Sequence, residues 1–348
     1  MLDEAKPTPI AQIQELRVEF QTQDGPVLGV ENVSFDINAG ETVCVVGESG
    51  SGKSVSSLSL MRLVEFGGGK IAGGRLLFER QNDPAVDLAR TDQDVMREIR
   101  GNEIGMIFQE PMTALNPVFT VGRQLTEGLR LHKNMSKSQA EARALELLTQ
   151  VRIPEPARRM KQYPHELSGG MRQRVVIAMA LACSPRLLIA DEPTTALDVT
   201  IQAEILALID RLKRETGTAV MFITHDMAVV AQMADRVVVM FRGNKVEEGS
   251  VEEIFENPQH PYTKALLAAV PKLGEMRGKA YPEPMKLLGT QDKEIVPIKG
   301  TEETLLTVNN LTTRFPVQGG FLRRTVANVH AVEDLSFTIN KGQTLSLV

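Results

Sequence analysis

The sequence has no tryptophan and only two cysteines among its 348 residues. Cys44 and Cys183 are too few for a disulfide framework, and both stand among apolar residues, which suits a reducing compartment. The longest uninterrupted apolar run, 175–183, has nine residues, whereas a membrane-spanning helix needs about 20. We therefore expect any contact with a membrane to go through partner proteins.

An excess of basic residues is also absent, because 44 Asp and Glu face 39 Lys and Arg, for a net charge of -5. This balance argues against a protein that binds nucleic acid through a dominant basic surface. The N-terminal MLDEAKPTPI lacks the basic and then apolar pattern of a signal peptide. With 42% apolar and 24% charged residues, the composition is that of a globular protein, and the length allows two or three domains.

One segment of the chain is repeated. Residues 29–46 (GVENVSFDINAGETVCVV) and 331–348 (AVEDLSFTINKGQTLSLV) align without gaps at an offset of 302, with nine of eighteen positions identical. The first copy runs on into a glycine-rich loop, whereas the second stops at Val348, before an equivalent loop. We therefore expect a tandem protein whose second domain is truncated here.

Between the copies, strand-like and helix-like segments alternate, which predicts an α/β fold with a parallel sheet. Strands are predicted at 42–46, 187–190, 219–223 and 237–240, and helices at 55–63, 137–151, 169–183 and 201–214. The block 97–165 shows no strand after residue 108 and is predicted to be a helical insertion. Proline, glycine and charge dominate from about 281 to 303, which indicates a linker.

A glycine-rich stretch, GESGSGKS, lies between a predicted strand and a predicted helix and fits the pattern G-x-x-x-x-G-K-[ST]. The glycines let successive backbone N–H groups surround a phosphate, the lysine adds a charge, and the last hydroxyl is suited to Mg²⁺. Alone, the pattern also fits an ordinary glycine-rich turn. The candidate residues are Gly47, Glu48, Ser49, Gly50, Ser51, Gly52, Lys53 and Ser54.

Two later strands end in polar residues that suit phosphate chemistry. The run LLIADE ends in Asp191, placed to bind a metal, and Glu192, placed to polarise a water molecule. His225 follows the run AVMFIT, where its ring could hydrogen-bond a γ-phosphate. Taken singly, an acidic turn after a strand and a lone histidine are more often structural, so their order after the glycine-rich stretch carries the argument.

The segment LSGGMRQ opens a predicted helix with Ser168, Gly169 and Gly170. Serine is a common helix N-cap, but two glycines in the first turn each weaken a helix by about 1 kcal/mol relative to alanine. Backbone N–H groups that no side chain obstructs form an anion site at a helix start. The sequence thus predicts a second phosphate-binding element.

With these motifs in this order, residues 16–271 resemble the ATP-binding subunits of ABC transporters. The resemblance implies a RecA-like P-loop ATPase core with an antiparallel β subdomain and the helical insertion. It also implies that Phe20 stacks on adenine, that Gln109 (in IFQEPMTALNP) is the Q-loop glutamine, and that Asp198 belongs to the D-loop. In the family pattern ATP and Mg²⁺ are bound, with Ser54, Gln109 and Asp191 near the metal and with Glu192, Gln109 and His225 as catalytic residues.

The stretch after Gln109 and the tail NPQHPYTKALL are similar to those of the peptide, opine and nickel importers. The segments PTTALDVTIQAEILALI and AVPKLGEMRG resemble those of tandem members of this group, and the resemblance implies uptake of glutathione or another small peptide. The resemblance implies two integral-membrane permease subunits, a periplasmic substrate-binding protein, and a peripheral position on the cytoplasmic face of the inner membrane. No nucleic acid is implied. No cysteine follows Cys183, so an iron–sulfur centre is not supported.

The expected organisation is an ATP-binding domain at 10–271, a linker at 272–304 and the start of a second ATP-binding domain at 305–348. By the family pattern, two such domains close on ATP, and Ser168–Gly170 complete the partner's site. The groove between the core and the 97–165 block is the hypothesised docking surface for a permease. Because the second copy stops early, we expect the chain to need self-association or a missing remainder, to bind ATP and to hydrolyse it weakly.

Two other classes of protein use the same motifs. One is a soluble tandem ATPase that acts on ribosomes or DNA, which the importer-like tail and the absence of a basic linker disfavour. The other is a regulatory ATP-binding module without turnover, which the presence of both Glu192 and His225 disfavours.

Overall fold

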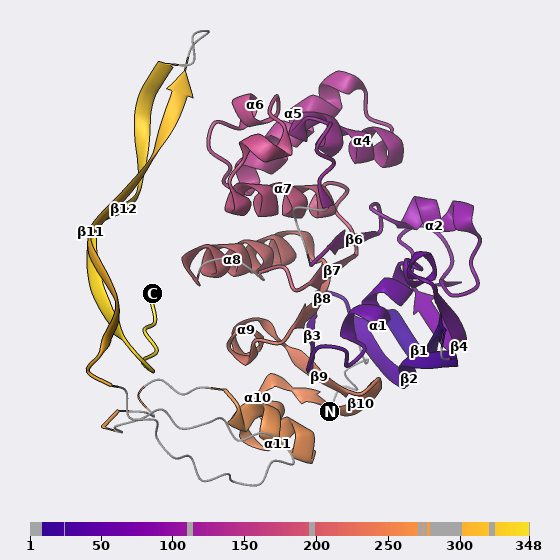
Figure 1. The fold of residues 1–348 in the computed structure, drawn as a ribbon. Helices are drawn as coiled ribbons and strands as arrows, with labels where there is room; N and C mark the ends of the chain where they lie inside the picture. Colours follow the sequence, from indigo (N-terminus) through magenta and orange to yellow (C-terminus); the bar gives the residue numbers. More distant parts are fainter. Residues whose placement is uncertain are drawn as a thin grey trace, which may run out of the picture. The chain divides into compact units, whose positions relative to one another are not determined.

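The computed structural model describes residues 9–23, 25–109, 114–194, 199–270, 274, 277–278, 301–319 and 324–347. The chain forms two compact units, Met1–Pro271 and Lys272–Val348 (Figure 1). Most of the expected linker at 272–304 lies outside the described residues. Its role, and the assignment of the two flanking segments as domains, stay predictions.

A six-stranded sheet forms the core of the first unit, in the order β10-β9-β3-β8-β7-β6. Neighbouring strands run parallel, except that β10 pairs antiparallel with β9. Every residue of β3, β7 and β8 is buried, and strands covered on both faces are expected to be continuous apolar runs. All four predicted strands are confirmed. The strands are β3 (Thr42–Val46), β6 (Ile104–Ile107), β7 (Leu187–Asp191), β8 (Ala219–Thr224), β9 (Arg236–Phe241) and β10 (Asn244–Ser250).

A second, antiparallel sheet of four strands covers one face of the core sheet, in the order β2-β1-β4-β5. Its strands are β1 (Pro9–Thr22), β2 (Gly25–Asn38), β4 (Gly69–Phe78) and β5 (Val86–Asp87). Successive side chains of a strand point to opposite faces of its sheet. In β3, Val43 and Val45 pack against the antiparallel sheet, while Cys44 and Val46 pack against the helices on the other face. Figure 1 shows β1, β2 and β4 grouped beside α1 (Lys53–Leu60), with α2 (Gln93–Ile99) nearby. The short helix η1 (Val64–Gly67) precedes β4.

The other face of the core sheet is covered by helices. The helices that contribute buried residues to the core on this side are α4 (Val121–Lys133), α5 (Lys137–Gln150), α7 (Gly169–Leu181), α8 (Val199–Thr216), α9 (Met227–Met233), α10 (Val251–Glu256) and α11 (Pro261–Ala268). Two short helices, α6 (Pro156–Arg159) and η2 (Pro164–Glu166), come between α5 and α7 in the chain. The four predicted helices are confirmed within a few residues at their ends. The predicted block at 97–165 is helical only in part, because it begins at the end of α2 and includes β6 of the core sheet. None of the helices in the described ranges is long and apolar enough to cross a bilayer.

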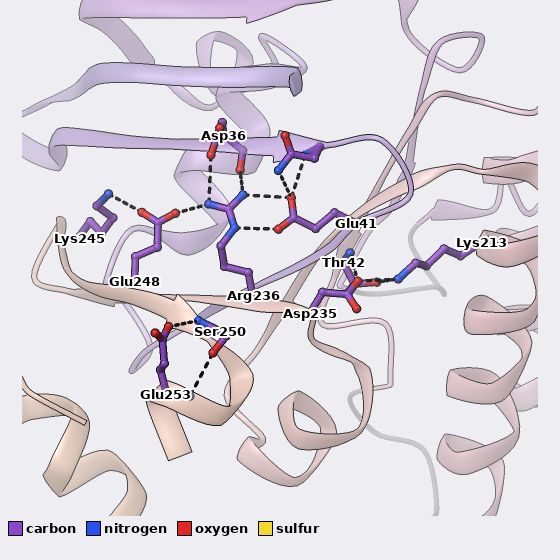
Figure 2. Close-up of polar contacts among 11 residues, drawn as sticks. Asp36, Glu41, Thr42, Lys213, Asp235, Arg236, Lys245, Glu248, Ser250 and Glu253 are labelled. Atoms are coloured by element: carbon purple, nitrogen blue, oxygen red, sulfur yellow. Dashed lines mark hydrogen bonds and ion pairs between the residues drawn. The ribbon is translucent and has the colours of Figure 1, made fainter. Parts of the chain in front are cut away.

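An arginine joins the two sheets of the first unit. Arg236 of β9 donates to Glu41 at 2.7 Å and 3.1 Å, to the Asp36 carboxylate of β2 at 3.1 Å, and to Glu248 of β10 (Figure 2). The hydrogen bond to Glu41 is the largest cause that raises the pKa of Arg236 further above its ordinary value. We call Arg236, Asp36, Glu41 and Glu248 the Arg236 cluster. It fixes β2 to the core sheet through charge-assisted bonds.

In the second unit, the described residues form the antiparallel hairpin of β11 (Thr304–Gly319) and β12 (Arg324–Asn340). The repeated segment predicted from the sequence lies partly on β12, just as its first copy lies partly on β2.

Candidate functional site

The residues predicted to bind phosphate or metal, or to act in catalysis, converge at one edge of the core sheet. Gly47 follows β3, Gln109 follows β6, Asp191 ends β7 and His225 follows β8. These four strands are parallel, so their carboxyl ends meet at the same edge, where ligands bind in open α/β sheets. Residues more than 170 positions apart in the sequence therefore become neighbours through the topology.

The phosphate loop, Gly47–Ser54, depends on glycine at three positions. Gly47, Gly50 and Gly52 have φ values of 148°, 79° and 100°, a region that side-chain-bearing residues avoid. A Cβ atom at Gly47 would lie 2.2 Å from the carbonyl oxygen of Met240, and one at Gly52 would lie 2.8 Å from that of Gly29. The backbone can thus turn tightly between β3 and α1. Glu48, Ser49 and Gly50 are exposed on the outer part of the loop, whereas Ser51 is buried.

Lys53 lies inside the phosphate loop. Its side chain is buried, and Nζ donates to the carbonyl oxygens of Gly47 and Glu48, at 2.8 Å each. Burial lowers the pKa of Lys53 from its ordinary value, although the carboxylates of Glu192 and Asp191 oppose this shift. The ammonium group is therefore held near both the loop amides and the acidic strand end, where a phosphate would need a positive charge.

Ser54 and Asp191 form the candidate magnesium pair. Ser54 Oγ donates to Asp191 Oδ1 at 3.1 Å, and Asp191 is only 4% exposed. Burial raises the pKa of Asp191 to about 6, and the charge of Glu192 also raises it, while the Ser54 hydrogen bond and Lys53 lower it. A hydroxyl and a carboxylate are oxygen ligands of the kind that Mg²⁺ prefers. Among the described residues no group of three or more His, Cys, Asp and Glu could hold a metal, so Mg²⁺ here would need phosphate or water oxygens as well.

Glu192 lies between the other two predicted catalytic residues. Gln109 Nε2 donates to Glu192 Oε2 at 3.1 Å, and His225 Nδ1 lies 3.2 Å from Glu192 Oε1. The φ of Glu192 is 46°, an unusual value for a residue with a side chain, and its backbone N–H bonds to Ile223 at 3.0 Å, which holds it at the strand end. A carboxylate oriented in this way can accept a proton from a water molecule. Gln109 contacts Glu192 here, whereas its predicted place beside the metal stays a prediction.

The remaining predicted residues are not part of this cluster. Phe20 of β1 is partly buried, and its ring fills the space that side chains at Gly29 and Gly69 would occupy. Ser168 caps α7 and accepts a hydrogen bond from Met171 N, while Ser168 and Gly169 are exposed. Helix α7 contacts α4, α5 and β6 and lies apart from α1 in Figure 1. Asp198 lies outside the described residues.

One contact with the phosphate loop is not predicted from the sequence. Tyr262 of α11 accepts a hydrogen bond from Glu48 N at 2.9 Å. The tail that contains Tyr262 is singled out only by its resemblance to importer tails and as a structural cap. Nothing in its spacing indicates that it reaches a loop 214 residues earlier.

The chain resembles known proteins along most of its length. The family profile described as "ABC transporter" matches residues 30–195, and the one described as "Oligopeptide/dipeptide transporter, C-terminal region" matches residues 246–293. The glutathione import ATP-binding protein GsiA of Pectobacterium atrosepticum is 54% identical over 345 residues, which are 97% of this chain and 55% of that protein. The chain thus spans about half the length of the curated relatives it matches.

Solved structures of ABC cassettes have the same fold. The dimeric structure of a bacterial ABC transporter cassette is 30% identical, with a TM-score of 0.61 over 69% of this chain and 98% of that chain. A dimeric post-hydrolysis state of an ATP-binding cassette bound to ADP and Pi has the same TM-score and coverage at 29% identity. The predicted fold class and the predicted resemblance are confirmed. The chain belongs to the ABC transporter ATP-binding family and carries the C-terminal region of its oligopeptide and dipeptide transporter members.

Proposed function

We propose that this chain is an ATP-hydrolysing subunit of an ABC importer whose cargo is glutathione or another small peptide. The observation that carries the proposal is the convergence of Lys53, the Ser54–Asp191 pair and the Gln109–Glu192–His225 group at one sheet edge. The name of the 54% identical relative and the match to the oligopeptide/dipeptide transporter region support the cargo.

In the proposed site, the loop amides from Gly50 to Ser54 and the ammonium of Lys53 bind the β- and γ-phosphates. Ser54 and Asp191, with Gln109, hold Mg²⁺, which when bound neutralises phosphate charge. Glu192 accepts a proton from the water molecule whose oxygen forms a bond to the γ-phosphorus as the bond to ADP breaks. His225 orients Glu192 and faces the γ-phosphate. Phe20 stacks on the adenine.

The exposed start of α7, predicted to be a second phosphate-binding element, supports dimerisation of the nucleotide-binding domain. Ser168 and Gly169 are exposed at the start of α7, a helix that contacts α4, α5 and β6. Gly170 and Asp198 complete the proposed contact with the nucleotide of a second domain. The two cassettes with the same fold were both solved as dimers.

We infer the further partners from the family, namely two permease subunits and a substrate-binding protein. From the family we also infer a position on the cytoplasmic face of the inner membrane.

Binding of a fluorescent ATP analogue with Mg²⁺ to the 348-residue chain tests the nucleotide site. Lys53→Ala should weaken binding by about tenfold or more, because a charge-assisted bond contributes roughly 1.5–3 kcal/mol. Lys137→Ala is the matched control, since the Lys137 side chain on α5 is 81% exposed. Failure of the unmodified chain to bind, or equal binding by the two variants, would refute the proposed site.

Hydrolysis and cargo need separate assays. Glu192→Gln should keep the affinity for ATP and lower phosphate release by about a hundredfold or more, because the general base is lost. Uptake of labelled glutathione by cells that lack the gene for this chain tests the cargo. Unchanged phosphate release would contradict the role of Glu192, and unchanged glutathione uptake would contradict the cargo alone.

A further inference from the structure

Tyr262 links the C-terminal tail to the phosphate loop. Its hydroxyl accepts a hydrogen bond from the backbone N–H of Glu48, the second residue of that loop, at 2.9 Å. The Tyr262 side chain comes from α11, within the segment matched by the oligopeptide/dipeptide transporter region, and the residue is 2% exposed. A buried hydroxyl at hydrogen-bond distance from a loop amide restrains the loop in one conformation.

The elements around Tyr262 hold its ring in place. The ring packs on Phe241, the last residue of β9, with 4.2 Å between the ring centroids and 31° between the planes. Glu247 of β10 accepts hydrogen bonds from the backbone N–H groups of Gln259 at 2.6 Å and His260 at 3.0 Å, just before α11. Figure 1 shows α10 and α11 next to β9 and β10. The position of the hydroxyl is therefore set by the core sheet.

Both the backbone N–H and the backbone carbonyl of Glu48 are hydrogen-bonded. Its N–H bonds to Tyr262, while its carbonyl oxygen accepts Lys53 Nζ at 2.8 Å and Ser51 N at 3.1 Å. The Glu48 residue itself is exposed, so the backbone contacts carry this restraint. A shift of the Glu48 backbone would move the carbonyl that orients the Lys53 ammonium.

We propose that Tyr262 is a positioning residue for nucleotide binding, which fixes Glu48 so that the phosphate loop and Lys53 are preorganised for the triphosphate. The inference rests on the proposed ATP site and adds to it a specific role for the C-terminal region. Preorganisation increases affinity because less ordering is left for the binding step. By reciprocity, a bound nucleotide stabilises the contact between the loop and α11.

Tyr262→Phe tests the proposal because it keeps the ring on Phe241 and removes only the hydroxyl. The dissociation constant for the fluorescent ATP analogue with Mg²⁺ should rise about three- to tenfold, the size expected for one neutral hydrogen bond. The melting temperature of the nucleotide-free chain should stay near that of the unmodified chain. Tyr163→Phe is the matched control, since Tyr163 is 40% exposed and immediately precedes η2, and it should leave the affinity unchanged.

Hydrogen exchange distinguishes positioning from a general packing role. In nucleotide-free Tyr262→Phe, backbone amides of the phosphate loop should exchange faster while those of α10 and α11 keep their protection. Faster exchange across α10 and α11 with a lower melting temperature would mean that the hydroxyl serves tail packing, which overturns the proposal.

An unchanged dissociation constant in Tyr262→Phe would also overturn it. In that case loss of binding in Lys53→Ala would leave the proposed function standing, so the two failures are distinguishable.

Discussion

The hairpins β1–β2 and β11–β12 have the same backbone design in different surroundings. The register pairs Leu16 with Val33 in the first hairpin and Leu311 with Leu335 in the second. Glu15 and Asn310, the residues just before Leu16 and Leu311, have positive φ values of 48° and 49°. Their backbone N–H groups donate to serine hydroxyls of the partner strand at 2.7 Å and 2.8 Å. The same irregularity thus occurs in both hairpins.

The two hairpins differ in how deeply their apolar side chains are buried. Leu16 and Val33 are fully buried beneath the core sheet, whereas Leu311 and Leu335 are 43% and 36% exposed. Local sequence therefore suffices to specify the strand pairing and its bulges, while burial of the apolar face depends on the sheet that β1 and β2 cover. The two copies also differ in charge, since Gln343 stands where the first copy has Glu41 of the Arg236 cluster.

The largest expected difference between the hairpins is in stability. Leu16→Ala should lower the free energy of unfolding of the first unit by about 2–5 kcal/mol, through lost burial and the cavity left behind. Leu311→Ala, at the equivalent position of the second hairpin, should change the free energy of unfolding by about 0.5 kcal/mol or less, because the Leu311 side chain is largely exposed. Urea unfolding followed by circular dichroism measures both. Equal losses of unfolding free energy in the two variants would contradict the difference in burial between the hairpins.

A smaller effect is expected from the charged cluster. Burial alone would raise the pKa of Glu41, but hydrogen bonds from Arg236 and Asn38 outweigh it and lower the pKa below its ordinary 4.5. A carboxylate with a lowered pKa stabilises the folded state above about pH 4.5, and this stabilisation is lost as the pH falls through the folded value.

Glu41→Gln should therefore cost about 1–2 kcal/mol at pH 7 and flatten the loss of stability in acid. Gln343→Glu, the reciprocal change at the equivalent position of the second copy, should alter neither the stability at pH 7 nor its acid dependence. Urea unfolding at pH 7 and pH 4 tests this, and an acid dependence in Glu41→Gln as steep as that of the unmodified chain would be the contrary result.

The smallest effect concerns the aromatic residues that occupy the same place in both registers, Phe20 opposite Val27 and Phe315 opposite Val329. Under the proposed function, Phe20→Leu should weaken ATP binding by about two- to tenfold, because an aromatic stack contributes roughly 0.5–1.5 kcal/mol. Leucine keeps an apolar side chain beside Gly29 and Gly69. Phe315→Leu should have no effect on binding in this chain. Titration with the fluorescent ATP analogue compares them, and equal dissociation constants would argue against adenine stacking by Phe20.

Most of the core elements can be predicted from the sequence because their patterns are strong. The buried strands β3, β7 and β8 are continuous apolar runs, and α5 and α8 show clear helical periodicity. Helix α1 begins at Lys53, two residues before its predicted start, because the loop glycines lead directly into the helix. The place of β6 in the core sheet is missed, since a four-residue strand next to a helical block carries little periodicity.

The sequence alone determined the glycines that a phosphate loop requires, the order of the polar strand ends and the repetition of residues 29–46 at 331–348. These follow from local conformation and residue spacing, which are properties of short segments. Only the tertiary structure decided which side chains meet, namely Ser54 with Asp191 and Glu192 with both Gln109 and His225. The order of the parallel strands brings these residues together, and the packing of α11 on β9 adds the contact between Tyr262 and the phosphate loop.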